Sequence, residues 1–251
     1  MSVKENMVLC LSGFDPTGGA GILADIKAIE AAGSYGMGVI TANTIQTEKH
    51  FLSNEWIDQK YIIRQLKTLL QEYKFRVIKI GIIENLTFLE EVITIITDKN
   101  PDIKIVWDPV LKSTTGYEFH SQVHELQLNN ILTKISLITP NIPEYKILFN
   151  DKQPSAISIG RCAVLLKGGH GTNNQTIDKL YIENKEFLFY GNKSKYSKHG
   201  SGCVLSSTIA GHLALDFSLN KACEKAKNYM NNFIISNKSL LGKHMYNYDE
   251  N

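Results

Sequence analysis

The feature that most constrains the fold is a regular alternation of short apolar runs with longer amphipathic segments. The apolar runs are rich in β-branched residues and lack polar alternation, which is typical of parallel strands buried on both faces. They lie at Met7–Ser12, Gly38–Thr44, Val77–Ile83, Ile103–Trp107, Leu137–Thr139 and Ala163–Lys167. Segments with helical spacing separate them, at Gly19–Ala32, Trp56–Gln71, Thr87–Asp98 and Val123–Thr133. The pattern predicts an α/β protein whose mainly parallel sheet lies between layers of helices.

The chain departs from this alternation after residue 176. Ile177–Ile182 and Glu186–Tyr190 flank a turn-like segment, which predicts an antiparallel hairpin and therefore a mixed sheet at that edge. Two helices are expected from Gly202 onward. No repeat, low-complexity tract or long linker divides the sequence, so we expect one domain over residues 1–251, with a polar tail from His244 that frays.

Composition excludes several functional classes. The 251 residues are 43% hydrophobic and 21% charged, which suffices for a sizeable core. The formal net charge is +2, without a basic stripe, so we expect no nucleic acid partner. No segment approaches the ~18 apolar residues of a membrane span, and the apolar run near the N-terminus is too short for a signal sequence. Four widely spaced cysteines without a C-x-x-C pair favour a reducing, cytoplasmic location.

A glycine-rich segment, Gly13–Gly21, follows the first predicted strand and opens a helix. Open α/β sheets bind ligands beyond the carboxyl ends of their strands, and free amides at a helix start attract polar or anionic groups. The segment is not a Walker A loop, because Ile22 and Leu23 follow Gly21 in place of Lys-Ser/Thr. The structural alternative is a tight turn that needs glycine. Asp25 lies one turn further into this helix, where a solvated acid is the ordinary interpretation.

Polar side chains also follow later strands. Asp108 and Glu144 come after two adjacent strands. Hydrated Mg²⁺ prefers a few carboxylates together with waters, so these two acids are candidate ligands for that ion. The alternative is that both acids belong to ordinary proline-containing turns. Lys167 begins the segment Lys167-Gly168-Gly169-His170 and can meet phosphate, unless it is a surface lysine. Gln46 carries one acceptor and two donors at another strand end, where a surface glutamine is the alternative. The histidines have no metal-ligand spacing, so no zinc site is expected.

The segment from Lys198 to Cys203 precedes a helix of small apolar residues. Gly200, Ser201 and Gly202 can turn successive amides toward one point, forming an anion hole for phosphoryl oxygens. Cys203 lies in the first turn, where the helix dipole favours a thiolate. We expect its pKa to fall from about 8.5 toward neutrality, which suits a proton acceptor. A buried packing cysteine is the alternative.

Together and in this order, these segments resemble the hydroxymethylpyrimidine/phosphomethylpyrimidine kinase family of the ribokinase-like superfamily. The resemblance extends from Val8 to about Leu215 and rests on the stretches Ser12–Asp25, Tyr35–Gln46, Lys79–Gly81, Asp108–Val110, Thr139–Glu144, Lys167–His170 and His199–Cys203. It implies a three-layer αβα ribokinase-like fold with a mostly parallel central sheet and an antiparallel edge hairpin. It also implies a homodimer that uses ATP and Mg²⁺ to phosphorylate 4-amino-5-hydroxymethyl-2-methylpyrimidine, and then its monophosphate, in thiamine biosynthesis.

The resemblance further implies roles for individual residues. The pyrimidine would be surrounded by Gly13, Ala20, Asp25, Thr44, Gln46, Ile82, Val110 and Cys203. ATP and Mg²⁺ would be met by Asn141, Glu144, Lys167 and the amides of Gly200, Ser201, Gly202 and Cys203. Cys203 stands where the wider superfamily has an aspartate base, which marks the pyrimidine and pyridoxal kinase branch.

Some positions depart from the family pattern. Thr44 stands where valine is common, Ser201 where threonine is common, and residues 111–116 differ from the usual segment. Two alternatives remain open. A pyridoxal kinase of the same branch acts on a similar flat ring with a hydroxymethyl group, and a catalytically silent homologue would bind ligands without turnover.

Overall fold

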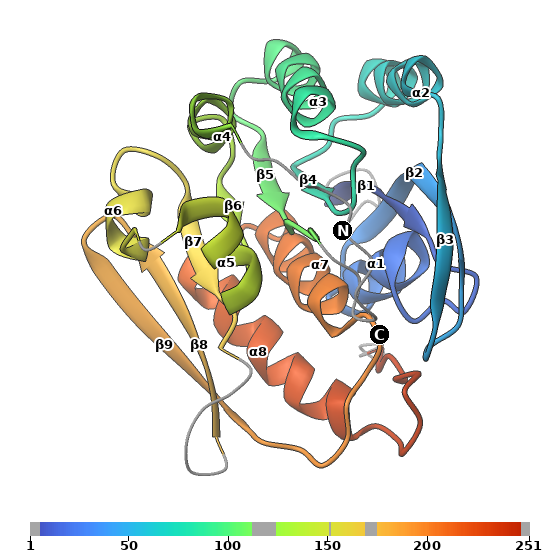
Figure 1. Ribbon diagram of the computed structural model, residues 1–251, viewed down its shortest axis with the longest axis vertical. Helices are drawn as coiled ribbons and strands as arrows, with labels where there is room; N and C mark the ends of the chain where they lie inside the picture. The colour runs from blue at the N-terminus through green and yellow to red at the C-terminus, as the bar shows by residue number, and fades with distance from the viewer. Residues whose placement is uncertain (1–5, 112–123, 151, 169–174, 247–251) are drawn as a thin grey trace.

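The strands that the structure describes join in a single nine-stranded sheet (Figure 1). The computed structural model describes residues 6–111, 124–150, 152–168 and 175–246. Within these residues the strands are β1 (Met7–Phe14), β2 (Tyr35–Gln46), β3 (Phe51–Trp56), β4 (Val77–Ile80), β5 (Lys104–Trp107), β6 (Leu137–Ile138), β7 (Ala163–Leu166), β8 (Gln175–Ile182) and β9 (Lys185–Asn192). Their order across the sheet is β3-β2-β1-β4-β5-β6-β7-β8-β9.

The middle of the sheet is parallel and both edges are antiparallel. Strands β2, β1, β4, β5, β6 and β7 pair in parallel, as the uninterrupted apolar runs predict. The predicted hairpin is confirmed as β8 and β9, with Ile182 paired to Lys185 across the turn. At the other edge β3 pairs antiparallel with β2, and no strand was predicted there. Its exposed and half-exposed side chains give no run of apolar residues by which to recognise it.

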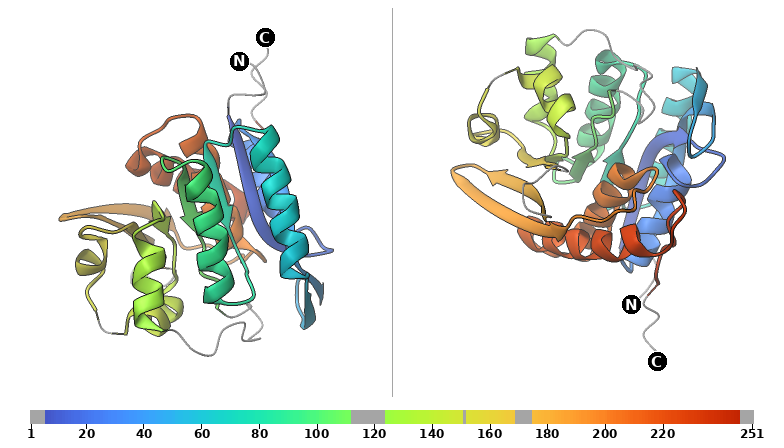
Figure 2. Two further views of the ribbon diagram at one scale, coloured as in Figure 1. Left: turned by 90° about the horizontal axis from the view of Figure 1, so that it is seen from above. Right: turned by 60° about the horizontal axis from the view of Figure 1, so that its bottom comes forward.

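Helices cover both faces of the sheet, which confirms the predicted three-layer αβα fold (Figure 2). One face packs against α1 (Gly21–Ala31), α7 (Ser201–Ala214) and α8 (Leu219–Ile235). The other packs against α2 (Gln59–Glu72), α3 (Leu86–Lys99), α4 (Glu125–Leu132), α5 (Ile142–Phe149) and α6 (Pro154–Ser158). The helices α5 and α6 were not predicted, although Asn141 and Glu144 carry the sequence signal of a capping box. Within the described residues, no helix has the length and apolarity needed to cross a bilayer.

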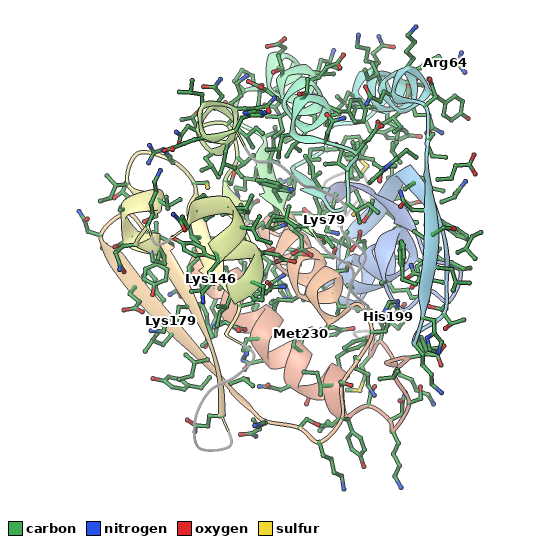
Figure 3. All side chains as sticks on the ribbon, viewed as in Figure 1. Arg64, Lys79, Lys146, Lys179, His199 and Met230 are labelled. Atoms are coloured by element: carbon green, nitrogen blue, oxygen red, sulfur yellow. The ribbon has the colours of Figure 1, made fainter. Side chains whose placement is uncertain are left out.

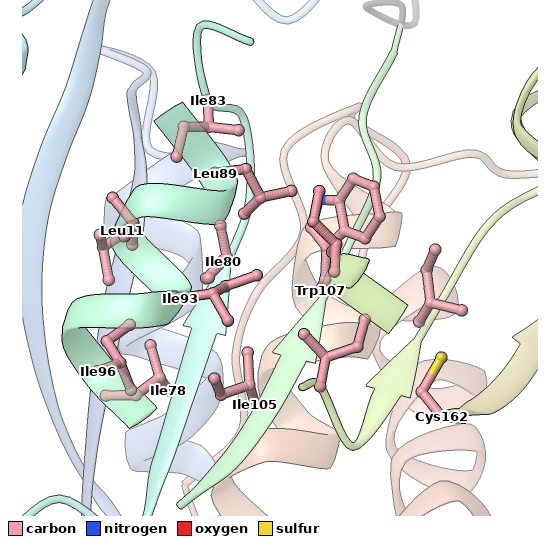
Figure 4. Packing of buried hydrophobic residues seen from close by; sticks show 14 of the residues in the cluster. Leu11, Ile78, Ile80, Ile83, Leu89, Ile93, Ile96, Ile105, Trp107 and Cys162 are labelled. Atoms are coloured by element: carbon pink, nitrogen blue, oxygen red, sulfur yellow. The ribbon is translucent and has the colours of Figure 1, made fainter. Parts of the chain in front are cut away.

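Two hydrophobic cores lie on opposite faces of the sheet. Leu9 and Leu11 of β1 point into the core under α2 and α3, whereas Val8 and Cys10 of the same strand point toward α1 and α7. Trp107 closes the first core at the end of β5 (Figure 4). Burial on both faces explains why these strands read as continuous apolar runs.

Candidate active site

A cavity of about 920 Å³ opens where the parallel strands end. The loops after these strands form one wall, and the first turn of α7 with part of α8 forms the other. Fourteen of the predicted site residues line it, namely Gly13, Ala20, Thr44, Gln46, Ile82, Asp108, Val110, Asn141, Glu144, Lys167, Gly200, Ser201, Gly202 and Cys203. The structure therefore brings segments from most of the chain to one place, and their contacts with ligands stay predictions.

Two glycines hold the loops of this cavity in close contact. Gly21 has φ +59°, and a Cβ on it would lie 2.2 Å from the carbonyl oxygen of Gly13. Gly200 has φ +69°, and a Cβ there would lie 2.1 Å from the carbonyl oxygen of Gly19. Only glycine fits both conditions at these positions. Gly200 caps α7 without a side-chain hydrogen bond, so no side chain caps the first amides of this helix.

Asp15 and His199 join the two loops by a side-chain contact that the sequence analysis did not identify. Asp15 is fully buried, and its carboxylate accepts hydrogen bonds of 2.9 Å from the amides of Thr17 and Ala20. Nε2 of His199 lies 2.9 Å from Oδ2 of the same carboxylate. Burial acts to raise the pKa of Asp15, but hydrogen bonds from His199 and Thr17 outweigh it and hold the pKa below its usual value.

Lys167 lies between two buried carboxylates. Its Nζ is 2.8 Å from Oδ1 of Asp108 and 3.9 Å from Oε2 of Glu144. Burial opposes the charge on Asp108, yet Lys167 and a hydrogen bond of 3.0 Å from Thr139 Oγ1 hold its pKa below the usual value. Glu144 has the opposite shift, because burial and the nearby Asp108 raise its pKa to about 7 despite Lys167. The cluster is therefore short of positive charge.

Asn141 and Glu144 also have a structural role at the start of α5. Oδ1 of Asn141 accepts from the amide of Glu144 at 2.8 Å, and Oε2 of Glu144 accepts from the amide of Asn141 at the same distance. This capping box fixes both side chains before any ligand binds. A carboxylate has two oxygens, so the cap does not exhaust the coordinating capacity of Glu144.

The carboxylates fit a hydrated magnesium ion. Asp108 and Glu144 supply oxygen donors on either side of Lys167, and Mg²⁺ binds through one or two carboxylates with waters and substrate phosphates. A cation bound beside Glu144 would offset both the cost of burying its charge and the repulsion from Asp108 that together raise its pKa. No group of three or more His, Cys, Asp or Glu suited to a metal is found among the described residues, so a cage made of protein ligands alone is not formed there.

Gln46 and Thr44 form a short hydrogen-bond chain at the opposite end of the cavity. Nε2 of Gln46 donates to Oγ1 of Thr44 at 2.8 Å, and this hydroxyl donates to the carbonyl oxygen of Phe14 at 2.8 Å. The chain fixes the orientation of the Gln46 amide. The departure from valine at position 44 thus adds a hydroxyl that orients its neighbour.

Asp25 does not line the cavity, and its interpretation as a solvated helix acid is wrong. The side chain is fully buried on the inner face of α1. Its two oxygens lie 2.9 and 2.8 Å from Nζ of Lys79, which is also fully buried. The sequence does contain a signal for this pair, because Lys79 lies inside the apolar run Val77–Ile83. A lysine in a strand buried on both faces cannot reach water, so it needs a buried acid as its partner.

The predicted fall in the pKa of Cys203 is wrong for this structure. Burial raises the pKa of the thiol to about 11, although nearby Lys79 acts to lower it. Asp25 and Asp108 add to the rise. Desolvation and the two neighbouring acids therefore outweigh the lowering of the pKa by Lys79. The sequence could not reveal these acids as neighbours, because they come from distant segments.

Further polar residues line the end of the cavity beside α8. Oδ2 of Asp178 accepts from Nζ of Lys227 at 2.7 Å, and its Oδ1 accepts from the amide of Gly168 at 3.0 Å. This contact fixes the backbone next to Lys167. Met230 contributes an apolar surface to the same wall (Figure 3). Gly169, His170 and the divergent residues 112–116 lie outside the described residues.

Comparison with known sequences places the chain in a family. Residues 15–249 match the sequence model described as phosphomethylpyrimidine kinase. The hydroxymethylpyrimidine/phosphomethylpyrimidine kinase of Aquifex aeolicus (strain VF5) is 32% identical over 246 residues, which cover 93% of this chain and 96% of that protein. The thiamine biosynthetic bifunctional enzyme of Arabidopsis thaliana is 31% identical over 252 residues, which cover 95% of this chain and 48% of that protein.

A solved structure agrees with this assignment. The phosphomethylpyrimidine kinase from Clostridium difficile 630 superposes with a TM-score of 0.73 at 31% identity, covering 89% of this chain and 97% of that one. Pyridoxal kinase of Bacillus subtilis, solved as an ADP complex, gives a TM-score of 0.82 at 23% identity, covering 95% and 97%, and shows a likeness of fold alone. The chain belongs to the phosphomethylpyrimidine kinase family.

Proposed function

We propose that the protein is an ATP-dependent kinase that phosphorylates the hydroxymethyl group of 4-amino-5-hydroxymethyl-2-methylpyrimidine, and then its monophosphate, in thiamine biosynthesis. The observation that carries this proposal is one cavity in which Cys203, the uncapped start of α7 and Lys167 lie together. The names of relatives at 30–32% identity support the choice of substrate. The first test is release of ADP by the purified protein, which must depend on the aminopyrimidine.

The pyrimidine fits the end of the cavity beside β1 and β2. The oriented amide of Gln46 has an oxygen that can accept from the exocyclic amine and a second N–H that can donate to an adjacent ring nitrogen. Gly13 and Ala20 leave room for a flat ring, and Ile82 and Val110 add apolar contact. These groups would place the hydroxymethyl substituent toward α7.

The phosphates of ATP fit the opposite side of the same cavity. Lys167 offers an ammonium on a side chain that is partly exposed to the cavity. The amides of Ser201, Gly202 and Cys203 lie at a helix start that no side chain caps. Asp108 and Glu144 would hold Mg²⁺, with Asn141 beside them. When bound, Mg²⁺ offsets negative charge on the phosphates.

Transfer would be direct and in line. The hydroxymethyl oxygen attacks the γ-phosphorus, the bond to the β-phosphate oxygen breaks, and ADP leaves. The hydroxyl proton passes to the thiolate of Cys203, which must first lose its own proton. With a thiol pKa of about 11, the thiolate is a minor form at neutral pH, so turnover should rise as the solution becomes alkaline.

A pyridoxal kinase is the second candidate, because the Bacillus subtilis enzyme of that name shares the fold. At 23% identity this likeness says nothing of substrate. The orientation of Gln46 favours the aminopyrimidine, since the amide can pair with an amine and a ring nitrogen at once. Kinetics with both substrates under the same conditions separate the two enzymes. Binding of ATP without turnover would indicate a silent homologue.

Two further proposals concern the assembly and the location of the protein. The homodimer follows from the family resemblance, and light scattering on the purified protein tests it. The cytoplasmic location is supported by the cysteines at 10, 162, 203 and 223, all of which are free thiols. Localisation of a tagged full-length protein in its own cells would test it.

A further inference from the structure

Lys79 and Asp25 form an ion pair that is fully buried and does not line the cavity. Lys79 lies in the middle of β4 with Ile78 and Ile80 on either side, in the interior of the molecule (Figure 3). Its Nζ lies 2.8 and 2.9 Å from the oxygens of Asp25, and both side chains are inaccessible to solvent. Stability does not explain such a pair, because well-packed apolar side chains are often equally stable or better in its place.

The ion pair is connected to α7 one helical turn after the Cys203 thiol. Oδ1 of Asp25 also accepts a hydrogen bond of 2.7 Å from Oγ of Ser207. Ser207 lies four residues after Cys203, and this spacing places both side chains on one face of the helix. The pair therefore joins α1, β4 and α7 at the point where α7 carries Cys203.

Gly81 leaves space beside the ammonium of Lys79 because it has no side chain. A Cβ on Gly81 would lie 2.9 Å from Nζ of Lys79 and 2.5 Å from Oγ of Ser12. The Ser12 hydroxyl is buried and has no hydrogen-bond partner among the described residues. A side chain at position 81 would displace the Ser12 hydroxyl, the Lys79 ammonium or both. The local sequence thus accommodates a cation in a region that is otherwise the apolar centre of the sheet.

Cys203 is surrounded by titratable groups from several elements. They are Asp25 on α1, Lys79 on β4, Cys10 on β1, Asp108 after β5 and Lys167 after β7. Lys167 is already paired with Asp108 at 2.8 Å. Asp25 and Asp108 disfavour a thiolate, whereas Lys79 favours it. Both lysines are paired with an acid, but Lys79, which Asp25 and Ser207 tie to α7, is the cation that favours the thiolate from within the core.

We propose that Lys79 is a positioning residue for phosphoryl transfer, whose ammonium is held by Asp25 and supplies the countercharge for the Cys203 thiolate. The link through Ser207 keeps that charge aligned with the first turns of α7. This inference rests on the proposed role of Cys203 as proton acceptor. It gives Asp25 an indirect role in catalysis, in place of the substrate contact implied by the family resemblance.

The test follows the pH dependence of Cys203 alkylation by iodoacetamide, with peptide mapping to separate this cysteine from the others. Lys79→Met removes the cation, so the alkylation midpoint should move to higher pH and the rate at a fixed pH below it should fall about tenfold or more. Asp25→Asn removes the acid and leaves the cation, so the midpoint should move to lower pH. A purely structural pair would not shift the two midpoints in opposite directions.

A double variant covers the case in which a single change prevents folding. Lys79→Met/Asp25→Leu removes the pair as a unit and should keep or raise the Tm. The midpoint of its alkylation curve should lie at a higher pH than that of the wild type and at a lower pH than that of Lys79→Met. Its kcat should fall about tenfold, with little change in the KM for ATP. The control is Lys221→Met, which breaks an exposed pair with Glu224 on α8 and should leave both the midpoint and kcat unchanged.

The outcomes separate the inference from the proposed function. Midpoints equal to the wild type in all variants, or shifted in the same direction by both single changes, would overturn the role of Lys79. Alkylation requires no phosphotransfer, so the midpoints decide the inference even for a protein without kinase activity. Absence of phosphotransfer in the wild type would count against the proposed function alone.

Discussion

Nε2 of His199 lies 2.9 Å from Oδ2 of Asp15, and this contact joins the glycine-rich loop after β1 to the loop that begins α7. In the proposed enzyme these loops hold the pyrimidine and the phosphates respectively. Their relative position sets the distance between the hydroxymethyl oxygen and the γ-phosphorus, and small errors in such a distance reduce rates strongly. A contact between two loops can thus matter for turnover without touching the reacting atoms.

The first prediction concerns this contact. His199→Leu removes one hydrogen bond from the buried carboxylate of Asp15 and should lower the free energy of unfolding by about 1–3 kcal/mol. It should also lower kcat more than it raises either KM, because both loops remain but lose their alignment. His199→Gln retains a donor and should recover part of kcat. Urea denaturation and steady-state kinetics measure both effects, and a His199→Leu protein with unchanged kcat would contradict the argument.

Cys203 gives the second prediction. Serine is similar in size but a much weaker acid, so Cys203→Ser should reduce kcat by ~10²–10⁴ while affinity for a non-hydrolysable ATP analogue is largely retained. The wild-type kcat should rise with pH through the neutral and mildly alkaline range, since burial raises the pKa of this thiol to about 11. The rise should be absent in Cys203→Ser. Near-full turnover in that variant would exclude the thiol from the chemistry.

The third prediction tests substrate choice by Gln46. Gln46→Leu leaves the polar groups of the pyrimidine unpaired and should cost about 1–3 kcal/mol in kcat/KM for the aminopyrimidine. Pyridoxal should be affected less. Thr44→Val is the matched control, because it keeps the shape but removes the hydroxyl that orients Gln46, and it should produce a smaller loss in the same direction. An unaltered preference between the two substrates in Gln46→Leu would show that the contact is wrong.

Acid should destabilise the protein through His212, which gives the fourth prediction. Burial and the charge of Lys225 lower the pKa of this imidazole to about 4, below its unfolded value of about 6.5. The neutral ring thus contributes stability above the unfolded pKa, and this contribution is lost as the pH falls from about 6.5 toward 4. The full shift corresponds to about 3 kcal/mol, and because the ring is only half-buried, solvent screening reduces the expected loss to roughly 2 kcal/mol at the acid end. His212→Phe should flatten that part of the curve of unfolding free energy against pH, and an unchanged slope would contradict the assignment.

Much of the fold could be predicted because parallel strands buried on both faces appear in the sequence as uninterrupted apolar runs. The apolar runs Val77–Ile83 and Ile103–Trp107 predict strands, and the structure has strands at Val77–Ile80 and Lys104–Trp107. The β3 edge strand could not be recognised, because its side chains alternate between exposed and half-exposed positions and its pairing depends on β2. The site residues could be located at strand ends, since the carboxyl ends of parallel strands meet at one edge.

The electrostatics of the site could not be predicted in the same way. The pKa of Cys203 depends on Asp25 and Asp108, which come from segments far away in the chain and approach the thiol only in the folded protein. The helix dipole at the start of α7 is a local effect, so it was visible in the sequence, whereas desolvation is a property of the packed core. The partnership of Lys79 with Asp25 spans 54 residues and is likewise a product of tertiary structure.

The most direct test of the central claim is the ratio of kcat/KM for 4-amino-5-hydroxymethyl-2-methylpyrimidine to that for pyridoxal, measured with the purified wild-type protein, ATP and excess Mg²⁺. Mass spectrometry of the product identifies the phosphate ester on the hydroxymethyl group. Lys167→Met is the matched control, because it removes the ammonium between Asp108 and Glu144 and should abolish most turnover. We expect a phosphorylated pyrimidine, formed with a ratio well above one. A ratio below one, or no phosphorylated pyrimidine from folded protein, would contradict the proposed function.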